Sequence, residues 1–181
     1  MTLSRSMTKK DFFNTVSQRK EDILQELLHL LSEMRIDHCV IGGLAFNAYV
    51  EPVVSLDLDL VIVAESLESF LKSLTKSFRI QRLPYGINLE SSKSDLRIQI
   101  QTDPRYQEFI SRALRKQVLG YKMKVASLMD VLQGKLWAYA DESRRKSKRQ
   151  KDLADIFRLV EAYPHVIEFL PETIKKLWQM E

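Results

Sequence analysis

Residues 41–63 read IGGLAFNAYVEPVVSLDLDLVIV, and this stretch decides the fold. Gly42-Gly43 closes a short apolar strand, and residues 44–49 are predicted to form a short helix that ends before Pro52. Residues 55–63 alternate polar and apolar side chains and then become wholly apolar, which predicts a strand with one buried end. The stretch is therefore predicted to run strand, glycine turn, short helix, strand.

The acidic residues of the second strand are the first candidates for chemistry. Asp57 and Asp59 alternate with leucines, so both carboxylates are predicted to point to one face, about 7 Å apart along the backbone. A divalent cation relieves their repulsion, and hard oxygen ligands suit Mg²⁺ or Mn²⁺. Gly42 and Gly43 let a polyphosphate approach the backbone, and Ser55 projects onto the acidic face. The alternative for the two acids is an edge strand that faces water.

The rest of the chain predicts one α/β (α+β) core, a mixed sheet flanked by helices, with a helical C-terminal extension. Residues 1–18 show no clear periodicity and are predicted to be a loosely docked arm. Residues 19–126 are expected to form the core, and residues 127–181 a helical region packed on it. Further helices are predicted at 19–34, 66–77, from Pro104, at 127–140 and after residue 151. Further strands are predicted at 38–41, 78–82, 86–89, 95–101 and 118–125.

The composition excludes several classes of protein. The chain has 181 residues, of which 45% are hydrophobic and 29% charged, which rules out collagen-like, low-complexity and wholly disordered chains. No apolar stretch is long enough for a membrane span, and the first residues do not resemble a secretory signal. Cys39 is the single cysteine, so an internal disulfide or a cysteine-based metal site is excluded. We therefore expect a cytoplasmic protein that does not enter a membrane.

The positive charge is concentrated in one segment. The formal net charge is +4, and residues 142–151 (ESRRKSKRQK) alone carry +5, which leaves the rest of the chain close to neutral. A local basic patch of this kind indicates a docking point for phosphates. The alternative is a solvated connection between two helices.

Two segments resemble a known superfamily. Residues 41–63 resemble the polymerase-beta-like nucleotidyltransferases, whose signature places Gly-Gly or Gly-Ser at a helix start and Ser/Thr-x-Asp-x-Asp on the next strand. Residues 135–159 (KLWAYADESRRKSKRQKDLADIFRL) resemble the AbiEii/AbiGii branch of abortive-infection and toxin–antitoxin enzymes, with a helix lysine, a basic stretch and a Lys/Arg-Asp-x-x-Asp-Ile/Leu motif. The chain departs from the pattern at Val53 and Val54, where relatives often carry an arginine. The resemblance implies a nucleoside triphosphate substrate and an antitoxin partner.

The resemblance also implies roles for further residues. It requires a third carboxylate on a neighbouring strand; Asp95, at the start of the alternating segment DLRIQIQ, is the candidate, and Glu90 and Asp103 are the alternatives. Lys135 extends the apolar stripe of its predicted helix, so it either reaches the surface or serves a polar cleft, and the motif favours binding of the triphosphate. Asp152 either orients Lys135 or forms only salt bridges within its helix.

Together these features predict a metal-dependent nucleotidyltransferase. Asp57, Asp59 and Asp95 are expected to hold Mg²⁺ or Mn²⁺ while a nucleoside monophosphate moves to an acceptor hydroxyl. RNA, in particular tRNA, is the expected acceptor, because some members of the toxin-like branch modify tRNA ends. The residues expected to bind RNA are Arg144, Arg145, Lys148 and Arg149. The alternatives are an inactive protein of this fold that binds RNA or a protein partner, and an enzyme with a small-molecule or protein acceptor.

Overall fold

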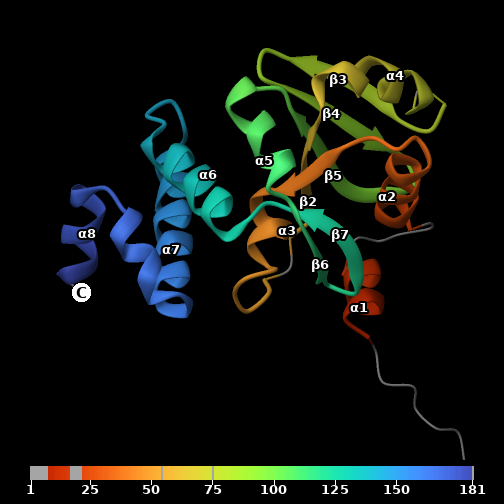
Figure 1. Ribbon diagram of the computed structural model, residues 1–181. Coiled ribbons are helices and arrows are strands. Elements are labelled where there is room, and N and C mark those ends of the chain that lie inside the picture. Colours follow the sequence, from red (N-terminus) through yellow and green to blue (C-terminus); the bar gives the residue numbers. More distant parts are fainter. Residues whose placement is uncertain (1–7, 17–21, 54, 75, 181) are drawn as a thin grey trace, which may run out of the picture.

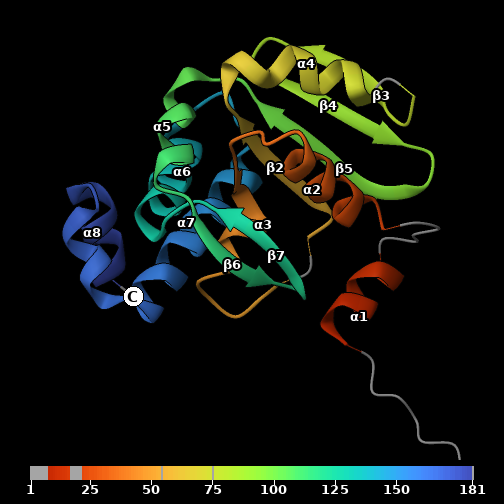
Figure 2. The same ribbon diagram turned by 45° about the vertical axis from the view of Figure 1, so that its right-hand side comes forward.

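The computed structural model describes residues 8–16, 22–53, 55–74 and 76–180, and Figures 1 and 2 show how its elements are arranged. The strands are β1 (His38–Ile41), β2 (Asp57–Ile62), β3 (Arg79–Leu83), β4 (Gly86–Ser91), β5 (Ser94–Gln101), β6 (Leu114–Val118) and β7 (Tyr121–Val125). The α-helices are α1 (Lys9–Val16), α2 (Ile23–Glu33), α3 (Gly42–Phe46), α4 (Ala64–Leu74), α5 (Gln107–Ser111), α6 (Leu128–Ala140), α7 (Lys146–Ala162) and α8 (Glu172–Gln179). Two 3₁₀ helices are η1 (Pro104–Tyr106) and η2 (Pro164–Phe169).

The strands form one mixed sheet in the order β3-β4-β5-β2-β1-β7-β6. Strand β2 is antiparallel to β1 and parallel to β5, and β1 is parallel to β7. The register of β2 and β5 places Asp57 opposite Arg97 and Asp59 opposite Gln99. A mixed sheet flanked by helices confirms the predicted α/β class.

The two faces of the central strands differ in polarity, as the alternation of the sequence predicts. Leu58 and Leu60 of β2 and Ile98 and Ile100 of β5 are buried. Helices α2 and α4 supply the buried leucines, isoleucine and phenylalanine that pack with this core. Because neighbouring residues of a strand point to opposite faces, Asp57 and Asp59 lie on the other face, together with the side chains of Arg97 and Gln99.

The C-terminal helices lie beside the sheet and close one side of its polar face. Helices α6, α7 and α8 gather together at one side of the sheet in both views (Figures 1 and 2). The short helix α3 contacts β2 on one side and α6 on the other, so it joins the sheet to these helices. Within the described ranges, no helix has the length and hydrophobicity that crossing a membrane requires.

The strand predicted at 118–125 is confirmed as β7 from Tyr121 onwards, but its start is wrong, because residues 114–125 form a hairpin of β6 and β7. Strands β6 and β7 are antiparallel, with Val118 paired to Tyr121. The turn consists of Leu119 and Gly120, whose φ angles of 50° and 89° are both positive. Two consecutive positive φ angles are typical of two-residue hairpin turns, which reverse the chain tightly.

The N-terminal segment is more regular than the irregular arm predicted for residues 1–18. Lys9–Val16 form α1, while residues 1–7 and 17–18 lie outside the described residues. Thr8 and Asp11 form a reciprocal cap, in which the Asp11 amide donates to Thr8 Oγ1 at 3.1 Å and the Thr8 amide donates to Asp11 Oδ2 at 3.0 Å. Such a capping box starts a helix even where apolar periodicity is weak.

Candidate active site

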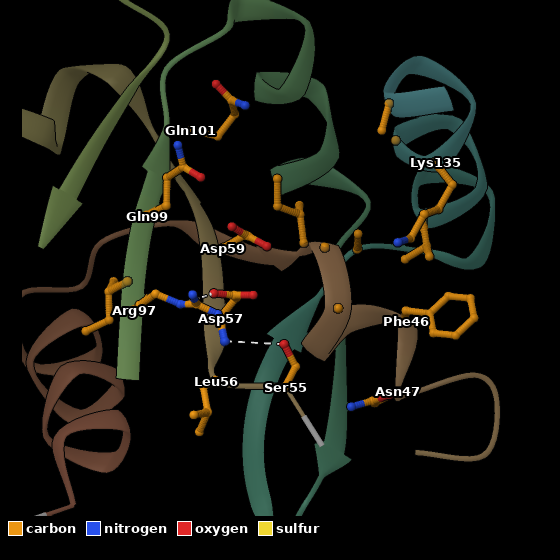
Figure 3. Close-up of a pocket in the computed structure, with 18 of the residues that line it drawn as sticks. Phe46, Asn47, Ser55, Leu56, Asp57, Asp59, Arg97, Gln99, Gln101 and Lys135 are labelled. Carbon is orange, nitrogen blue, oxygen red and sulfur yellow. Dashed lines mark hydrogen bonds and ion pairs between the residues drawn. The ribbon is translucent and has the colours of Figure 1, made fainter. Parts of the chain in front are cut away.

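Asp57 and Asp59 line a cleft of about 1000 Å³ between the sheet and the C-terminal helices. Figure 3 shows the two carboxylates on one side of the cleft and Lys135 on the other. We call the strand side the sheet wall; its polar residues include Asp57, Asp59, Asp95, Arg97 and Gln99. We call the opposite side the helical wall; its polar residues include Lys135, Arg144, Lys148, Lys151, Asp152, Asp155 and Arg158.

The carboxylate pair of the sheet wall carries an excess of negative charge. Burial, and next the negative charge of Asp57, raise the pKa of Asp59 to about 6, although Lys135 and Arg144 of the helical wall oppose this rise. A divalent cation would relieve the repulsion, and the hard oxygen atoms of the pair are ligands that suit Mg²⁺ or Mn²⁺. Among the described residues, no group of three or more His, Cys, Asp and Glu side chains is arranged to hold a metal. The chain therefore offers a divalent cation a pair of carboxylates.

Gly42 and Gly43 allow α3 to pack closely against β2. Gly42 has a φ of +65°, and a Cβ atom there would collide with the carboxylate of Asp59. A Cβ atom on Gly43 would lie 3.3 Å from Ser55 Oγ, which itself accepts a hydrogen bond from the Asp57 amide at 3.2 Å. The packing around the carboxylates thus requires Gly42, whereas a Cβ atom on Gly43 would make only a tight contact with Ser55. The expected contacts of both glycines and of Ser55 with phosphates stay predictions.

Strand β5 places Arg97 beside Asp57, whereas Asp95 was the residue of this strand predicted to join the carboxylates. Asp95 is exposed near the start of β5 and lines the cleft, but it lies two residues before Arg97, the residue paired with Asp57 in the sheet. Arg97 Nε lies 2.6 Å from Asp57 Oδ1. The alternation of DLRIQIQ predicted that Arg97 and Asp95 share a face, but the parallel register with β2 was not visible in the sequence. Asp95 as a metal ligand stays a prediction.

The two alternative carboxylates make other contacts. Glu90 lies 3.9 Å from Arg79, its partner across the β3–β4 pair. Asp103 caps η1, since its Oδ1 accepts a hydrogen bond from the Arg105 amide at 3.0 Å. Hydrogen bonds from the Arg105 guanidinium lower the pKa of Asp103, as expected for a carboxylate that stays ionised.

The helical wall is held together by a buried ion-pair network. Lys135 is 8% exposed, and its Nζ lies 3.1 Å from Asp152 Oδ1 and 2.6 Å from Asp155 Oδ2. Arg144 Nε lies 2.9 Å from Asp152, and Lys151 Nζ lies 3.0 Å from Asp155. Burial of Asp155 raises its pKa, but the charges and hydrogen bonds of Lys135 and Lys151 together outweigh burial, so the net pKa is lowered. The contact of Asp152 with Lys135 is confirmed; the parts of both residues in catalysis stay predictions.

The basic segment is only partly free to bind a ligand. Helix α7 begins at Lys146, inside the segment, so most of it is helical and only its beginning connects two helices. Arg149 Nε donates a hydrogen bond to the Tyr139 carbonyl at 2.7 Å, and Arg144 is bound to Asp152. Arg145 and Lys148 are exposed, and the described part of the chain offers neither of them an ion pair. Lys148 also lines the cleft.

The structure adds residues that the sequence did not suggest. Arg158 Nη2 donates to the Glu51 carbonyl at 2.8 Å, and its guanidinium lies 5.0 Å from the centre of the Phe46 ring. It thereby links α7 to the chain just after α3. Tyr106 and Phe109 also line the cleft, with ring centroids 5.1 Å apart. Their spacing of three residues was the available signal, but the helix predicted from Pro104 gave no indication of the face they cover.

Solved structures with the same fold define the class of protein. A lincosamide antibiotic adenylyltransferase has a TM-score of 0.55 at 12% identity, over 78% of this chain and 99% of that one. A nucleotidyltransferase-like protein from Paracoccidioides brasiliensis has a TM-score of 0.52 at 22% identity, over 85% of this chain and 78% of that one. The comparison with curated protein sequences gives no match. The chain therefore has the nucleotidyltransferase fold.

The family is shown by the sequence. The profile described as "Nucleotidyl transferase AbiEii toxin, Type IV TA system" matches residues 37–180, which include both walls of the cleft. The chain therefore belongs to the AbiEii family and is a nucleotidyltransferase. The resemblance of residues 41–63 to the nucleotidyltransferases and that of residues 135–159 to the AbiEii branch are confirmed.

Proposed function

We propose that the protein transfers a nucleoside monophosphate from a nucleoside triphosphate to a hydroxyl group of RNA, in particular tRNA, with Mg²⁺ or Mn²⁺ as cofactor. The observation that carries the proposal is the carboxylate pair on β2, which faces a basic helical wall across the cleft. The raised pKa of Asp59 supports it, because a bound cation would compensate the excess negative charge. The family description supports an antitoxin as partner. The proposed substrates place the enzyme in the cytoplasm.

The residues of the cleft have separate roles in this reaction. Asp57 and Asp59 would hold the metal ion, which supplies positive charge at the reacting phosphate when bound. Lys135, with the cations around it, offsets the charge of the triphosphate. The acceptor oxygen bonds to the α-phosphorus as the bond to the bridging oxygen breaks, and pyrophosphate leaves. Asp95, exposed at the cleft, accepts the proton of the acceptor hydroxyl in this proposal.

The carboxylate pair provides the decisive test. We expect the double variant Asp57→Asn, Asp59→Asn to lose at least about 10³-fold in transfer rate, since the loss of metal-binding charge removes several kcal/mol of transition-state stabilisation. The measurement is transfer of label from each α-labelled triphosphate to total cellular RNA. The variant should stay folded, because it removes a repulsion, and circular dichroism checks this. Transfer at the wild-type rate by the folded variant would refute the proposal.

In this proposal RNA is the acceptor because of the basic segment, residues 142–151. Arg145 and Lys148 of this segment form no ion pair with the described residues, so they are the positions to test. We expect Arg145→Ser, Lys148→Ser to weaken RNA binding and to reduce the slope of log K against log salt by about two units, roughly one for each phosphate that is no longer neutralised. The matched control is Arg115→Ser, Lys122→Ser, which removes the same charge from exposed positions on β6 and β7. An equal effect of both double variants, or none, would contradict the RNA assignment. Affinity for the triphosphate is compared in the single variant Arg145→Ser, where it should change little because Arg145 does not line the cleft.

A further inference from the structure

Arg97 makes the closest charged contact that either carboxylate of the sheet wall has. Its Nε lies 2.6 Å from Asp57 Oδ1, and the parallel pairing of β2 and β5 sets the two residues side by side. Figure 3 shows the Arg97 side chain extending along the sheet to Asp57. The ion pair is therefore a direct consequence of the strand register.

This contact occupies an oxygen atom that a metal ion would need. A guanidinium and a divalent cation are both attracted to the carboxylate, and each repels the other at short distance. Arg97 and a divalent cation would thus compete for Asp57. The outcome depends on how firmly Arg97 is held.

Arg97 is free to move aside. Its side chain is 75% exposed and that of Asp57 is 43% exposed, so water screens the pair and its net strength is modest. The described residues show no other ion pair or hydrogen bond of the Arg97 side chain. By contrast, the buried cation Lys135 across the cleft has two carboxylate partners.

We propose that Arg97 is a positioning residue that exchanges with the divalent cation at Asp57. This inference rests on the proposed metal-dependent transfer. In the absence of a ligand, Arg97 neutralises Asp57 and weakens the binding of a free cation. A cation that arrives with a triphosphate carries phosphate oxygens that accept the displaced guanidinium, so Arg97 favours the loaded substrate over the bare ion.

The exchange predicts opposite changes in two affinities. For Arg97→Gln, free Mn²⁺, measured by electron paramagnetic resonance, should bind about two- to fivefold more tightly, as expected for the loss of an exposed ion pair. A non-hydrolysable triphosphate saturated with Mn²⁺ should bind more weakly to the same variant, by roughly two- to fivefold. A purely structural role would not move the two affinities in opposite directions.

Two further variants complete the experiment. Arg97→Asp should bind free Mn²⁺ roughly tenfold more tightly than the wild type, because it replaces a competing charge with a ligand beside Asp57. Arg79→Gln is the matched control, since Arg79 is an exposed arginine of the same sheet that pairs with Glu90, and it should leave both affinities unchanged.

The result that would overturn the inference is wild-type affinity for free Mn²⁺ in both Arg97 variants, or a change of both affinities in the same direction in Arg97→Gln. Either result leaves the proposed function intact. That function fails separately, if the folded Asp57→Asn, Asp59→Asn variant still transfers nucleotides.

Discussion

The carboxylates of the two walls differ in their burial and in the number of cations that they contact. On the sheet wall, Asp57 contacts one exposed arginine, and within the described residues Asp59 has no ion pair. On the helical wall, Asp152 and Asp155 are almost fully buried, and each contacts at least two cations. Negative charge on the sheet wall is therefore available to a ligand, whereas the acids of the helical wall are already neutralised and hold α6 and α7 together. The comparison separates carboxylates that are open to a ligand from carboxylates that hold two helices together.

The largest expected effect comes from breaking the junction between the walls. Gly42→Ala would place a Cβ atom against the Asp59 carboxylate at a φ of +65°. The positive φ costs about 1–2 kcal/mol and the collision adds about 1–3 kcal/mol, so we expect a loss of about 4 kcal/mol in the free energy of unfolding, together with most of the transfer activity. Urea denaturation measures the loss.

Gly134→Ala is the control for this substitution. Gly134 lies within α6, and a Cβ atom there would be 3.8 Å from Tyr106 Cε1, an ordinary contact. Alanine is the better helix former by about 1 kcal/mol, so this variant should be slightly more stable than the wild type. Equal destabilisation by both alanines would show that the contact between a Cβ atom at position 42 and the Asp59 carboxylate is not what destabilises Gly42→Ala.

The next effect sharpens the contrast between buried and exposed ion pairs. Lys135→Met leaves Asp152 and Asp155 buried with fewer cations, so we expect it to lower the free energy of unfolding by about 3 kcal/mol. Lys124→Met removes a partly exposed lysine that lies 2.9 Å from Asp37, and should cost less than about 1 kcal/mol. Chemical denaturation of both variants measures the difference, and a cost below about 1 kcal/mol for Lys135→Met would contradict the stabilising role of the helical wall.

The smallest effect is a pH dependence of opposite sign on the two walls. Because the pKa of Asp59 is raised from 3.8 to about 6, the folded protein holds this proton more tightly than the unfolded chain does, and stability falls as the pH rises from about 4 to 6. The full shift corresponds to about 3 kcal/mol, and solvent at the half-buried side chain reduces it, so Asp59→Asn should exceed the wild type by about 2 kcal/mol at pH 7 and match it near pH 4.

Asp155 should show the reverse dependence. Its lowered pKa means that the ionised form stabilises the fold, and this contribution is lost as the pH falls through the folded pKa, below 3.8. Asp155→Asn should thus be less stable than the wild type at pH 7, with a deficit that shrinks in acid. Unfolding of both variants in the absence of divalent metal is measured at pH 7, at pH 4 for Asp59, and at about pH 2 for Asp155, whose contribution is lost only below 3.8. Parallel pH profiles would remove the electrostatic distinction between the walls.

Most of the sheet wall could be predicted from local sequence patterns. Alternation with leucines placed Asp57 and Asp59 on one face, and the glycines marked a strand-to-helix turn that the structure has with α3 beginning at Gly42. The helix predicted at 127–140 matches α6, and the helix predicted after residue 151 is α7, which begins earlier, at Lys146 inside the basic segment. These features depend on period and turn chemistry, which a short stretch of sequence contains.

What the sequence did not predict depends on pairing between distant segments. The Arg97–Asp57 contact requires the parallel register of β5 with β2, which local alternation does not determine. The hairpin of β6 and β7 was missed because Leu119 adopts a positive φ, which a leucine rarely does. Arg158 acts on the chain after α3 through a contact that spans 107 positions.

The order of the elements along the chain also sets when the cleft can exist during synthesis. The sheet ends with β7 at Val125, and the helices that form the opposite wall, α6 and α7, run from Leu128 to Ala162. A ribosome therefore produces every strand before the lysine that faces the carboxylates, and the nascent chain has an open sheet with no second wall. The parallel β2–β5 pairing is itself non-local and slow to form. The two-walled cleft is thus complete only after α7 has left the ribosome.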